Sequence, residues 1–266
     1  MEARWEHAFI TGASSGIGEA MARALPPATR LLLHGRDAAR LGGVAEKLAR
    51  QGRAVAVVAA DLATEAGRQA AVGASRSCPI DLLVCNAGFG ALGPHLQNDP
   101  TAETDMVAVN CMATVAISRA LLPDMLARAR ASGRRCGMIV VASVAGFAPL
   151  PYFATYAATK AFDLFFAEAL AEELRDDPID VLALCPGVTA TRFFERTGNA
   201  EAARRLMAGG HGHSAARVAR DALAALGRQR VLVVGAGNRL ATLVPRLAPR
   251  RLWSAMAGVA MNRWRR

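Results

Sequence analysis

Tyr156 and Lys160, in the stretch YAATK, are the residues whose types and spacing point most clearly to chemistry in this sequence. Lysines and arginines together number 32, yet only Lys47 and Lys160 are lysines, and the chain has only two tyrosines. Lysine carries a compact charge on a flexible stem, whereas arginine presents a planar fork. A lysine in a chain that otherwise uses arginine therefore indicates a site that requires a point charge.

The four-residue spacing would place the phenol of Tyr156 and the ammonium of Lys160 on one face of a helix. A phenol titrates near pH ~10 and is a poor acid or base at neutral pH. A nearby ammonium favours the phenolate, so we expect Lys160 to lower the pKa of Tyr156 and make it a usable proton carrier. A Tyr-x-x-x-Lys spacing often arises by accident, so the alternative is a tyrosine that only packs against its neighbours.

Short apolar runs alternate with helical patterns along the chain. The runs are continuous, as in strands that helices cover on both faces. This repetition predicts an α/β chain with a single-domain Rossmann fold, a doubly wound parallel sheet of about seven strands with helices on both faces. We expect 1–237 to form the domain and 238–266 a basic, apolar extension. The predicted strands are 7–10, 30–35, 54–61, 81–88, 137–143, 180–187 and 230–235. The predicted helices are 18–25, 38–52, 64–75, 101–131, 153–175 and 214–226.

The stretch TGASSGIGEA, residues 11–20, lies between the first predicted strand and the first predicted helix. Its glycines allow a tight turn and close approach of the backbone to a pyrophosphate, and the helix N-terminus supplies free N–H groups. A glycine-rich turn with a purely structural role is the alternative, but this position favours a dinucleotide site. The residues expected to contact the cofactor here are Gly12, Ser14, Ser15, Gly16, Ile17 and Gly18.

Arg36 follows the second predicted strand, which has no acid at its end. A site that prefers NAD usually has an acid there to hold the ribose 2′-hydroxyl, whereas an arginine can receive the 2′-phosphate of NADP. The sequence therefore favours NADP(H), with NAD(H) possible because Asp37 is adjacent. The alternative is that Arg36 only caps a solvated loop.

Over about residues 7–235 the chain resembles the short-chain dehydrogenases/reductases of the classical type. Ser143, thirteen residues before Tyr156, and Asn110 stand where this family has its other two catalytic residues. The remaining motifs are TGxxxGxG at Thr11, Gly12, Gly16 and Gly18, Asp61-Leu62, NAG at Asn86, Ala87 and Gly88, YxxxK at Tyr156 and Lys160, and PGxxxT at Pro186, Gly187 and Thr191.

The resemblance implies an oxidoreductase that transfers a hydride between a nicotinamide and a carbonyl or secondary alcohol, with ketone reduction favoured. Tyr156 would donate or accept the proton, helped by Lys160 and the oxidised nicotinamide. Ser143 would polarise the carbonyl as an oxyanion donor does, and Asn110 would hold a water against Lys160. The main alternative is a nucleotide-binding regulator of the same fold without turnover, and a second is a surface-associated scaffold.

The resemblance also implies the path of the cofactor. Asp61 and Leu62 would contact the adenine ring. The NAG stretch, Asn86, Ala87 and Gly88, would steady the sheet and border the adenosine ribose. The nicotinamide would be held by Pro186, Gly187, Thr189 and Thr191, with Thr191 on its carboxamide and Thr189 contributing main chain. Tyr156 and Lys160 would also contact the cofactor, Lys160 through hydrogen bonds to a ribose.

Composition limits the other function classes. The net charge of +10 comes almost entirely from the end of the chain, because Asp221 is the last acid and nine arginines follow it. A basic excess confined to one end does not predict nucleic-acid binding. The cysteines number five, with no CxxC and no zinc spacing, so we expect reduced thiols and no metal. We find no signal peptide and no apolar run near the ~18 residues of a membrane span, and expect a cytoplasmic protein.

The partners are inferred from the apolar residues outside the predicted core. Apolar residues in the expected substrate loops predict an apolar small-molecule substrate, although such residues also build subunit interfaces, and we expect a homodimer or homotetramer. In the tail, Pro245 and Pro249 should break or restart a helix. The apolar segment 252–261 between arginines could contact an anionic membrane peripherally, or could cover the active-site mouth or a neighbouring subunit. The residues predicted to line the substrate pocket from these loops are Phe89, Leu92, Phe147, Leu150, Tyr152, Phe153, Phe193, Phe194 and Met207.

Overall fold

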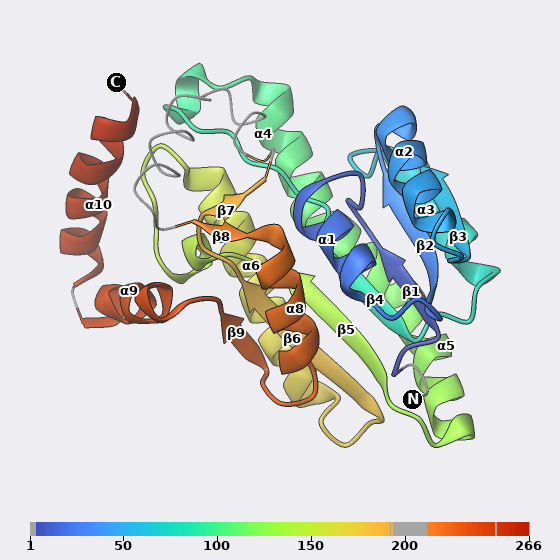
Figure 1. The fold of residues 1–266 in the computed structure, drawn as a ribbon. Helices are drawn as coiled ribbons and strands as arrows, with labels where there is room; N and C mark the ends of the chain where they lie inside the picture. The colour runs from blue at the N-terminus through green and yellow to red at the C-terminus, as the bar shows by residue number, and fades with distance from the viewer. Residues whose placement is uncertain (1–3, 192, 194–211, 248, 266) are drawn as a thin grey trace.

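The computed structural model of the chain describes residues 4–191, 193, 212–247 and 249–265, and these form three layers with helices on both faces of one sheet (Figure 1). The seven strands of the sheet are all parallel and have the order β3-β2-β1-β4-β5-β6-β9. They are β1 His7–Ile10, β2 Arg30–Gly35, β3 Val55–Ala59, β4 Leu82–Cys85, β5 Cys136–Val141, β6 Ile179–Cys185 and β9 Val231–Val233. The prediction of a doubly wound sheet of about seven parallel strands is confirmed.

The strand order reverses between β1 and β4, so the loops after these strands diverge. In open sheets of this kind, ligands bind in the crevice outside the carboxyl ends of the strands at such a switch point. Two short strands, β7 Thr189–Ala190 and β8 His213–Ser214, pair beside this edge. The fold therefore gathers the residues that end β1, β2, β4, β5 and β6 at one place.

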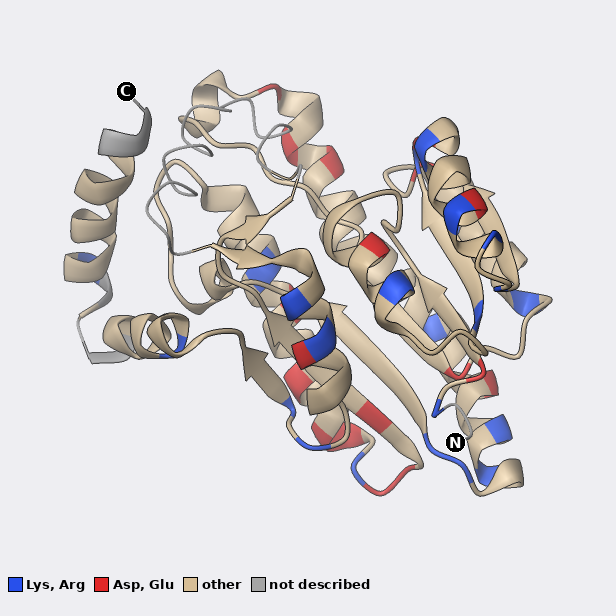
Figure 2. Ribbon diagram, viewed as in Figure 1, with Lys and Arg blue, Asp and Glu red and all other residues tan. Residues whose placement is uncertain are grey.

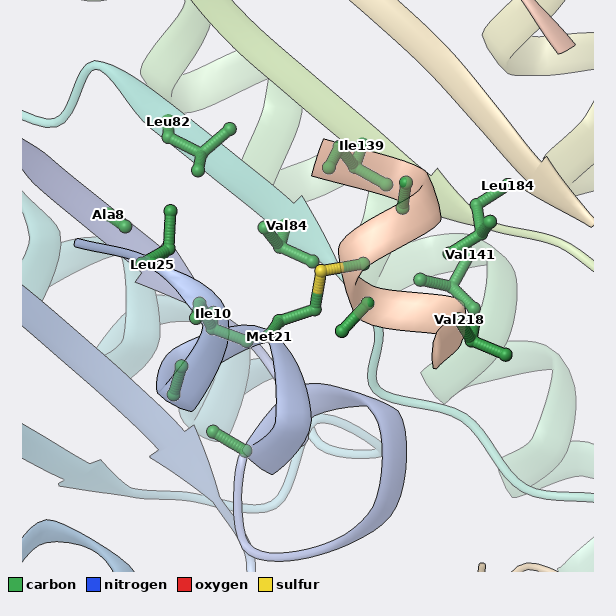
Figure 3. Close-up of a cluster of buried hydrophobic side chains, with 14 of the residues drawn as sticks. Ala8, Ile10, Met21, Leu25, Leu82, Val84, Ile139, Val141, Leu184 and Val218 are labelled. Atoms are coloured by element: carbon green, nitrogen blue, oxygen red, sulfur yellow. The ribbon is translucent and has the colours of Figure 1, made fainter. Parts of the chain in front are cut away.

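One face of the sheet is covered by α1 Gly16–Ala24, α2 Ala38–Ala49 and α8 Ala215–Ala225. Figure 3 shows the centre of this layer, where the thioether of Met21 lies among aliphatic side chains of the sheet and of α8. Met21 is fully buried and its flexible side chain fills the space between Val84 and Val218. This packing fixes α1 directly behind the glycine-rich turn.

The opposite face is covered by α3 Glu65–Arg76, α5 Ala113–Ser132 and α6 Ala154–Glu173. The helix predicted over 101–131 is present, but it consists of α4 Pro100–Val107, a π-helical turn Ala108–Met112 and then α5. π-helical turns often occur at functional sites, and this one carries Asn110. Two short 3₁₀ turns, His95–Gln97 and Val144–Phe147, lie in the loops above the sheet.

The chain ends in two further helices, α9 Ala236–Leu247 and α10 Arg250–Arg265. Pro249 separates them, as expected, but the expectation that Pro245 breaks the first is wrong, because α9 runs through it to Leu247. A proline in the last turn removes only one backbone donor, and a helix can tolerate that near its end. Figure 1 shows α9 and α10 beside β9, at the opposite edge from β3.

The described residues include one helix, Pro100–Ser132, that is long and apolar enough to cross a membrane by length and composition alone. Half of its most apolar window is buried within the fold, so the same apolar residues also serve the protein core. The five cysteines are free thiols, and all except Cys78 are buried. Within the described part of the chain, no group of three or more His, Cys, Asp or Glu residues is arranged to hold a metal ion.

Candidate active site

The glycine-rich turn lies directly against the residues that follow β4. Gly12 and Gly16 have positive φ angles of 66° and 62°, which favour glycine. A Cβ at Gly12 would lie 2.8 Å from the Cα of Ala87, and one at Gly18 would lie 2.5 Å from Nδ2 of Asn86. Larger residues cannot occupy these two positions without displacing the backbone, so the glycines fix the shape of the turn.

Asn86 and Thr11 tie this turn to the end of β4. The Thr11 hydroxyl accepts hydrogen bonds from the backbone N–H groups of Asn86 and Ala87, at 2.9 and 3.0 Å. The Asn86 amide donates to the carbonyl oxygens of Thr11 and Gly12, at 2.9 and 3.1 Å. The steadying contribution expected of Asn86 therefore has a clear geometric basis.

A cavity of about 1060 Å³ opens at the carboxyl edge of the sheet, above the glycine-rich turn. Its size is at the upper end of small-molecule sites. Of the residues predicted to form the site, Gly18 and Asn110 lie behind the cavity wall, Gly18 against Gly12 and Asn110 against Gly88. The predicted residues that line it are Gly12, Ser14, Ser15, Gly16, Ile17, Arg36, Asp61, Leu62, Asn86, Ala87, Gly88, Ser143, Tyr156, Lys160, Pro186, Gly187, Thr189 and Thr191.

The cavity fits a dinucleotide. Ser15 caps α1 without a side-chain hydrogen bond, so the first N–H groups of α1 are not satisfied by this residue. These groups lie at the cavity wall, where a pyrophosphate would meet them and the positive end of the helix dipole. The cavity continues from there in two directions, toward Arg36 and toward Tyr156.

Two arginines line the end of the cavity beside β2. Arg36 is mostly exposed, and its guanidinium lies 3.8 Å from the carboxylate of Asp61. Asp37 instead caps α2, with Oδ1 accepting the Arg40 N–H at 3.0 Å and Oδ2 3.0 Å from Nε of Arg40. Both oxygens of Asp37 are therefore engaged by its own helix. Arg40 was not predicted, although the helix that carries it was.

His34 is a second residue of this region that the sequence did not reveal. It is buried in β2, its Nδ1 accepts the Gly12 N–H at 3.4 Å, and its Nε2 lies 3.0 Å from the carbonyl oxygen of Ala60. Burial lowers the pKa of the imidazole below its ordinary value, against the opposing effects of Ala60 and Asp61. A neutral His34 with its proton on Nε2 satisfies both contacts and joins the glycine-rich turn to β3.

Tyr156, Lys160 and Ser143 meet at the other end of the cavity. Tyr156 and Lys160 lie one turn apart on α6, with Nζ 5.9 Å from the centre of the phenol ring, and Ser143 follows β5. The Ser143 hydroxyl acts to lower the pKa of the Tyr156 phenol, and it accepts the Ala145 N–H at 3.1 Å and donates to the carbonyl oxygen of Pro186 at 3.5 Å. The three side chains that were expected to act together are thus next to one another.

The pKa of Tyr156 differs from the expectation. Burial raises it above the ordinary value, while Lys160 and the Ser143 hydroxyl act to lower it and Asp163 raises it further. Lys160 therefore acts in the predicted direction, but the net prediction of a lowered pKa is wrong for the protein alone. The phenol is almost completely removed from water, and desolvation disfavours the phenolate.

Asp163 is the most consequential residue that sequence reasoning missed. Its Oδ2 lies 2.9 Å from Nζ of Lys160, which also donates to the carbonyl oxygen of Val141 at 2.8 Å. Burial lowers the pKa of the Lys160 ammonium, but Asp163 and Tyr156 act against it, and the pKa lies above its ordinary value. The available signal was an acid three residues after the lysine, within the otherwise apolar run AFDLFF.

Asn110 is held firmly by the π-helical turn. Its Nδ2 donates to the carbonyl oxygen of Phe89 at 3.0 Å and to the hydroxyl of Thr159 at 2.9 Å, and its Oδ1 accepts the Phe89 N–H at 3.1 Å. A Cβ on Gly88 would lie 3.0 Å from this Oδ1 and 3.4 Å from Nζ of Lys160. Asn110 and Lys160 therefore both approach Gly88, and the role of Asn110 in holding a water stays a prediction.

The loop after β6 closes the cavity from above. Thr189 donates from its hydroxyl to the carbonyl oxygen of Gly187 at 3.0 Å. Thr191 reaches across to the glycine-rich turn, where a Cβ on Gly16 would lie 3.1 Å from its methyl group. Thr191 is thus placed over the point where a pyrophosphate would lie.

The substrate end of the cavity is apolar. Phe153 stacks on Tyr156 with ring centres 4.3 Å apart, and the ring centre of Phe193 lies 5.1 Å from that of Tyr156. Leu92 packs against this cluster, and Tyr152, with a positive φ of 64°, lies outside the lining. Phe194 and Met207 fall outside the described residues. The predicted apolar residues that line the cavity are Phe89, Phe147, Leu150, Phe153 and Phe193.

The C-terminal helices complete this end. Asn238 and Thr242 of α9 and Trp253 and Met261 of α10 all line the cavity, and Met261 packs against the cluster that contains Tyr156. Of the alternatives for the tail, the coverage of the active-site mouth is therefore present within one chain. The inward faces of α9 and α10 cover the cavity, while an outward face of each helix remains exposed.

Comparison with known proteins agrees with this geometry. A family model described as short chain dehydrogenase matches residues 6–202. The chain is 31% identical over 265 residues to dehydrogenase/reductase SDR family member 7B of Bos taurus, covering 94% of this chain and 80% of the relative. It is 37% identical over 185 residues to 1-deoxy-11-beta-hydroxypentalenate dehydrogenase of Streptomyces avermitilis, covering 68% and 67%.

Solved structures give the same result. A short-chain dehydrogenase from Sphingobium yanoikuyae in complex with NADPH has a TM-score of 0.72 at 28% identity, covering 91% of this chain and 93% of that one. A short-chain dehydrogenase/reductase from Burkholderia phymatum in complex with NAD has a TM-score of 0.78 at 25% identity, covering 89% and 91%. The family model spans most of the chain, and the cavity lining extends from the glycine-rich turn to Tyr156. This chain therefore belongs to the short-chain dehydrogenase/reductase family, whose members act on hydroxyl or carbonyl groups with a nicotinamide cofactor.

Proposed function

We propose that the protein is an NADP(H)-dependent reductase of ketones, with the corresponding secondary alcohols as its products. The observation that carries the proposal is the meeting of Tyr156, Ser143 and Lys160 at the floor of the apolar end of the cavity. When bound, the nicotinamide supplies the hydride. The chain itself has to orient the carbonyl, exclude water and provide the proton.

Tyr156 is the proton donor in this proposal. Its phenol is buried and neutral in the resting protein, which is the form that can protonate a developing alkoxide. The Ser143 hydroxyl, which lines the same cavity, would donate to the carbonyl oxygen and fix its position. The proton path would continue through Lys160 toward Asn110, both of which approach Gly88.

The chain residues supply the cofactor site in four parts. The turn from Gly12 to Gly18 and the N-terminus of α1 would hold the pyrophosphate, and residues 86–88 would border the adenosine ribose. Asp61 and Leu62 would bound the adenine, and Pro186, Gly187, Thr189 and Thr191 would hold the nicotinamide.

Charge at the adenosine end supports the preference for NADP(H). Arg36 and Arg40 both line this end, and both oxygens of Asp37 are engaged by Arg40. A 2′-phosphate would therefore meet two guanidinium groups, which bind phosphate through charge-assisted hydrogen bonds. NAD(H) remains the alternative cofactor, with binding of nucleotide without turnover as the alternative function.

The substrate is a carbonyl compound with a sizeable apolar part. Five apolar side chains from three loops, together with Trp253 and Met261, surround the phenol of Tyr156. A small polar sugar would leave much of this surface without a partner. An apolar ketone would bury it at about 25 cal/mol for each Å² removed from water.

We further propose that the protein is a cytoplasmic homodimer. Val107, Met112 and Val115, around the π-helical turn, and Phe162 and Phe165 on α6 are exposed apolar side chains on neighbouring helices. Two copies that join these faces would bury them in the way that symmetric dimers usually do.

The outward face of α9 and α10 supports peripheral contact with an anionic membrane. It exposes Leu240, Leu243 and Val244 on α9 and Leu252, Met256 and Val259 on α10. Figure 2 shows basic but no acidic residues on these two helices, and the sequence has no acid after Asp221. Two such faces would repel each other, whereas anionic lipid headgroups would attract each one.

The test of the proposed function is NADPH oxidation by the purified full chain against ketones, quinones, 3-oxoacyl thioesters and steroids, with NADH in parallel. We expect turnover with at least one apolar ketone and a lower KM for NADPH than for NADH. Stoichiometric binding of NADPH with no oxidation across this panel would instead support the nucleotide-binding regulator.

A further inference from the structure

The carboxylate of Asp163 lies one helical turn beyond Lys160 and is buried as deeply as the catalytic residues. The exposed fraction is 2% for Asp163 and 5% for Lys160. Oδ2 is 2.9 Å from the ammonium nitrogen, while Oδ1 is buried without a hydrogen-bond partner in the structure. A buried carboxylate with an unsatisfied oxygen is costly to fold around, and its direct contact is with the lysine of the proton-transfer site.

The ammonium of Lys160 is fixed from two sides. It donates to Asp163 on its own helix and to the carbonyl oxygen of Val141 at the end of β5. Breaking a buried ion pair by removing one partner is unfavourable, because it leaves an uncompensated charge. Asp163 therefore limits both where Lys160 lies and how much positive charge the phenol of Tyr156 experiences.

The other titratable groups around this pair are neutral. They are Tyr156 on α6 and three thiols from the elements packed against it, Cys85 of β4, Cys111 of the π-helical turn and Cys185 of β6. Burial raises the pKa of the Cys111 and Cys185 thiols to about 12 and raises that of Cys85 further. Burial raises the pKa of the Asp163 carboxyl above its ordinary value, while the Lys160 ammonium acts to lower it. Lys160 and Asp163, 2.9 Å apart, are therefore the ion pair that the phenol faces.

The charge of Lys160 alone would favour the phenolate form of Tyr156. Paired with Asp163, the ammonium presents a dipole instead of a full positive charge, and the carboxylate itself acts against phenolate formation. Burial adds to this effect. The phenol is thereby kept as an acid.

We propose that Asp163 is a positioning residue that anchors the ammonium of Lys160 and offsets its charge, so that Tyr156 stays a protonated phenol ready for carbonyl reduction. This inference rests on the proposed function, because it takes the reaction to run as ketone reduction. In the reduction, the carbonyl carbon accepts the hydride from the reduced nicotinamide, and the carbonyl oxygen accepts the proton from the phenol. The phenolate that remains is reprotonated from solvent past Lys160.

The first measurement needs neither substrate nor cofactor. Because the chain has only two tyrosines, a Tyr152→Phe background leaves Tyr156 as the sole source of tyrosinate absorbance. In that background, Asp163→Asn should move the midpoint of the tyrosinate titration to lower pH by roughly one pH unit, the effect of one nearby charge. Asp163→Glu, which retains the charge, should restore the midpoint of the parent.

Glu173→Gln is the matched control, because it removes one exposed carboxylate from the same helix. It should leave the midpoint unchanged. An unchanged midpoint in Asp163→Asn, in protein whose circular dichroism shows it to be folded, would overturn the inference, and so would an equal shift in Glu173→Gln.

The pH profile of ketone reduction gives a second readout. Reduction requires the protonated phenol and is lost as pH rises through its pKa, so a lowered pKa moves the alkaline limb of kcat to lower pH. Asp163→Asn should show this shift, while Asp163→Glu should follow the parent. An alkaline limb that does not move would contradict the inference. Absence of turnover in the parent chain would instead refute the proposed function, whereas the tyrosinate titration would still report on Asp163.

Discussion

Trp253, in the first turn of α10, donates a hydrogen bond from its indole nitrogen to the carbonyl oxygen of Pro149, 3.3 Å away. Pro149 lies in the loop between Ser143 and Tyr156, so this contact joins the end of the chain to the segment that connects two catalytic positions. Gly258 of the same helix approaches Pro151 of that loop, with room for only a methyl group between them. The terminal helix is therefore a structural part of the active-site wall.

This arrangement has a consequence for substrate choice. The family model ends at residue 202, whereas Trp253 and Met261 line the cavity beyond it. The wall that faces the substrate is thus built partly by a segment outside the region that identifies the family. Changes in α10 should therefore alter the selectivity among ketones more than they alter the rate of hydride transfer.

Removal of the Tyr156 hydroxyl tests the proton donor. Tyr156→Phe keeps the ring that stacks on Phe153 but deletes the proton carrier, so turnover should fall at least ~10²-fold. Nucleotide binding, measured by quenching of intrinsic fluorescence, should change little. Tyr152→Phe is the matched control, since Tyr152 lies outside the cavity lining, and should retain most of the parent activity. Near-parent turnover in Tyr156→Phe would remove this residue from the mechanism.

Cofactor preference should depend on Arg36. Arg36→Ala removes a guanidinium from the adenosine end of the cavity and should weaken NADPH binding by about 10- to 100-fold, because charge-assisted contacts to phosphate are strong. NADH, which lacks the 2′-phosphate, should be affected much less. The Kd values from titration calorimetry decide this, with Arg50→Ala, an exposed arginine of the α2 C-cap paired with Glu46, as control. Equal affinity of the parent chain for the two cofactors would already refute the preference.

Much of the sheet could be predicted from the sequence because its strands are buried on both faces. A strand with both faces covered must be apolar throughout, so runs such as LLVC and GMIVV are recognisable without alignment. Motifs at strand ends could be recognised in the same way, since a parallel topology gathers all carboxyl ends of the strands at one edge of the sheet. The cavity lining accordingly contains most of the residues predicted for the site.

Features that depend on contacts between distant segments could not be predicted in this way. The π-helical turn at Asn110 replaces one set of backbone hydrogen bonds by another, and neither composition nor periodicity differs between the two. Asp163 would ordinarily be placed at a solvated position, because an acid is rarely buried unless paired. Its partner, Lys160, lies three residues earlier on the same helix, but the burial of the pair depends on the packing of α6 against β5, where Lys160 also donates to Val141. The docking of α10 on the 149–151 loop is similarly a tertiary property.

Subunit association should depend on the apolar face of α6. Phe165 is 64% exposed, and Phe162 beside it stacks on Phe166. Phe165→Glu would place a charge in the proposed dimer interface and should convert the protein to a monomer in sedimentation-velocity experiments. Phe165→Leu keeps the apolar character and should remain dimeric. A parent chain that sediments as a monomer would contradict the dimer, and a dimeric Phe165→Glu variant would exclude this face as its interface.

Membrane contact should depend on the outward face of α10 and not on the catalytic cavity. Truncation of the tail would remove Trp253 and Met261 from the cavity wall, so substitutions on the exposed face are the sharper experiment. Leu252→Gln and Met256→Gln together remove two side chains that are 54% and 55% exposed. They should reduce co-flotation with anionic liposomes at low salt by at least about tenfold, because each buried aliphatic side chain contributes roughly 1.5–3 kcal/mol. Turnover in solution and the oligomeric state should stay as in the parent.

Val57→Thr is the matched control for this experiment, because Val57 is an exposed apolar residue on β3, at the opposite edge of the molecule (Figure 1). It should float with anionic liposomes as the parent does. Raised salt should weaken the binding of both the parent and Val57→Thr, since the arginines of the tail would act through screened electrostatic attraction. Neutral liposomes should bind the parent poorly for the same reason. A parent chain that ignores anionic liposomes at low salt would refute membrane contact. A Leu252→Gln, Met256→Gln variant that floats unchanged but sediments as a smaller species would show that this face of α10 joins subunits instead.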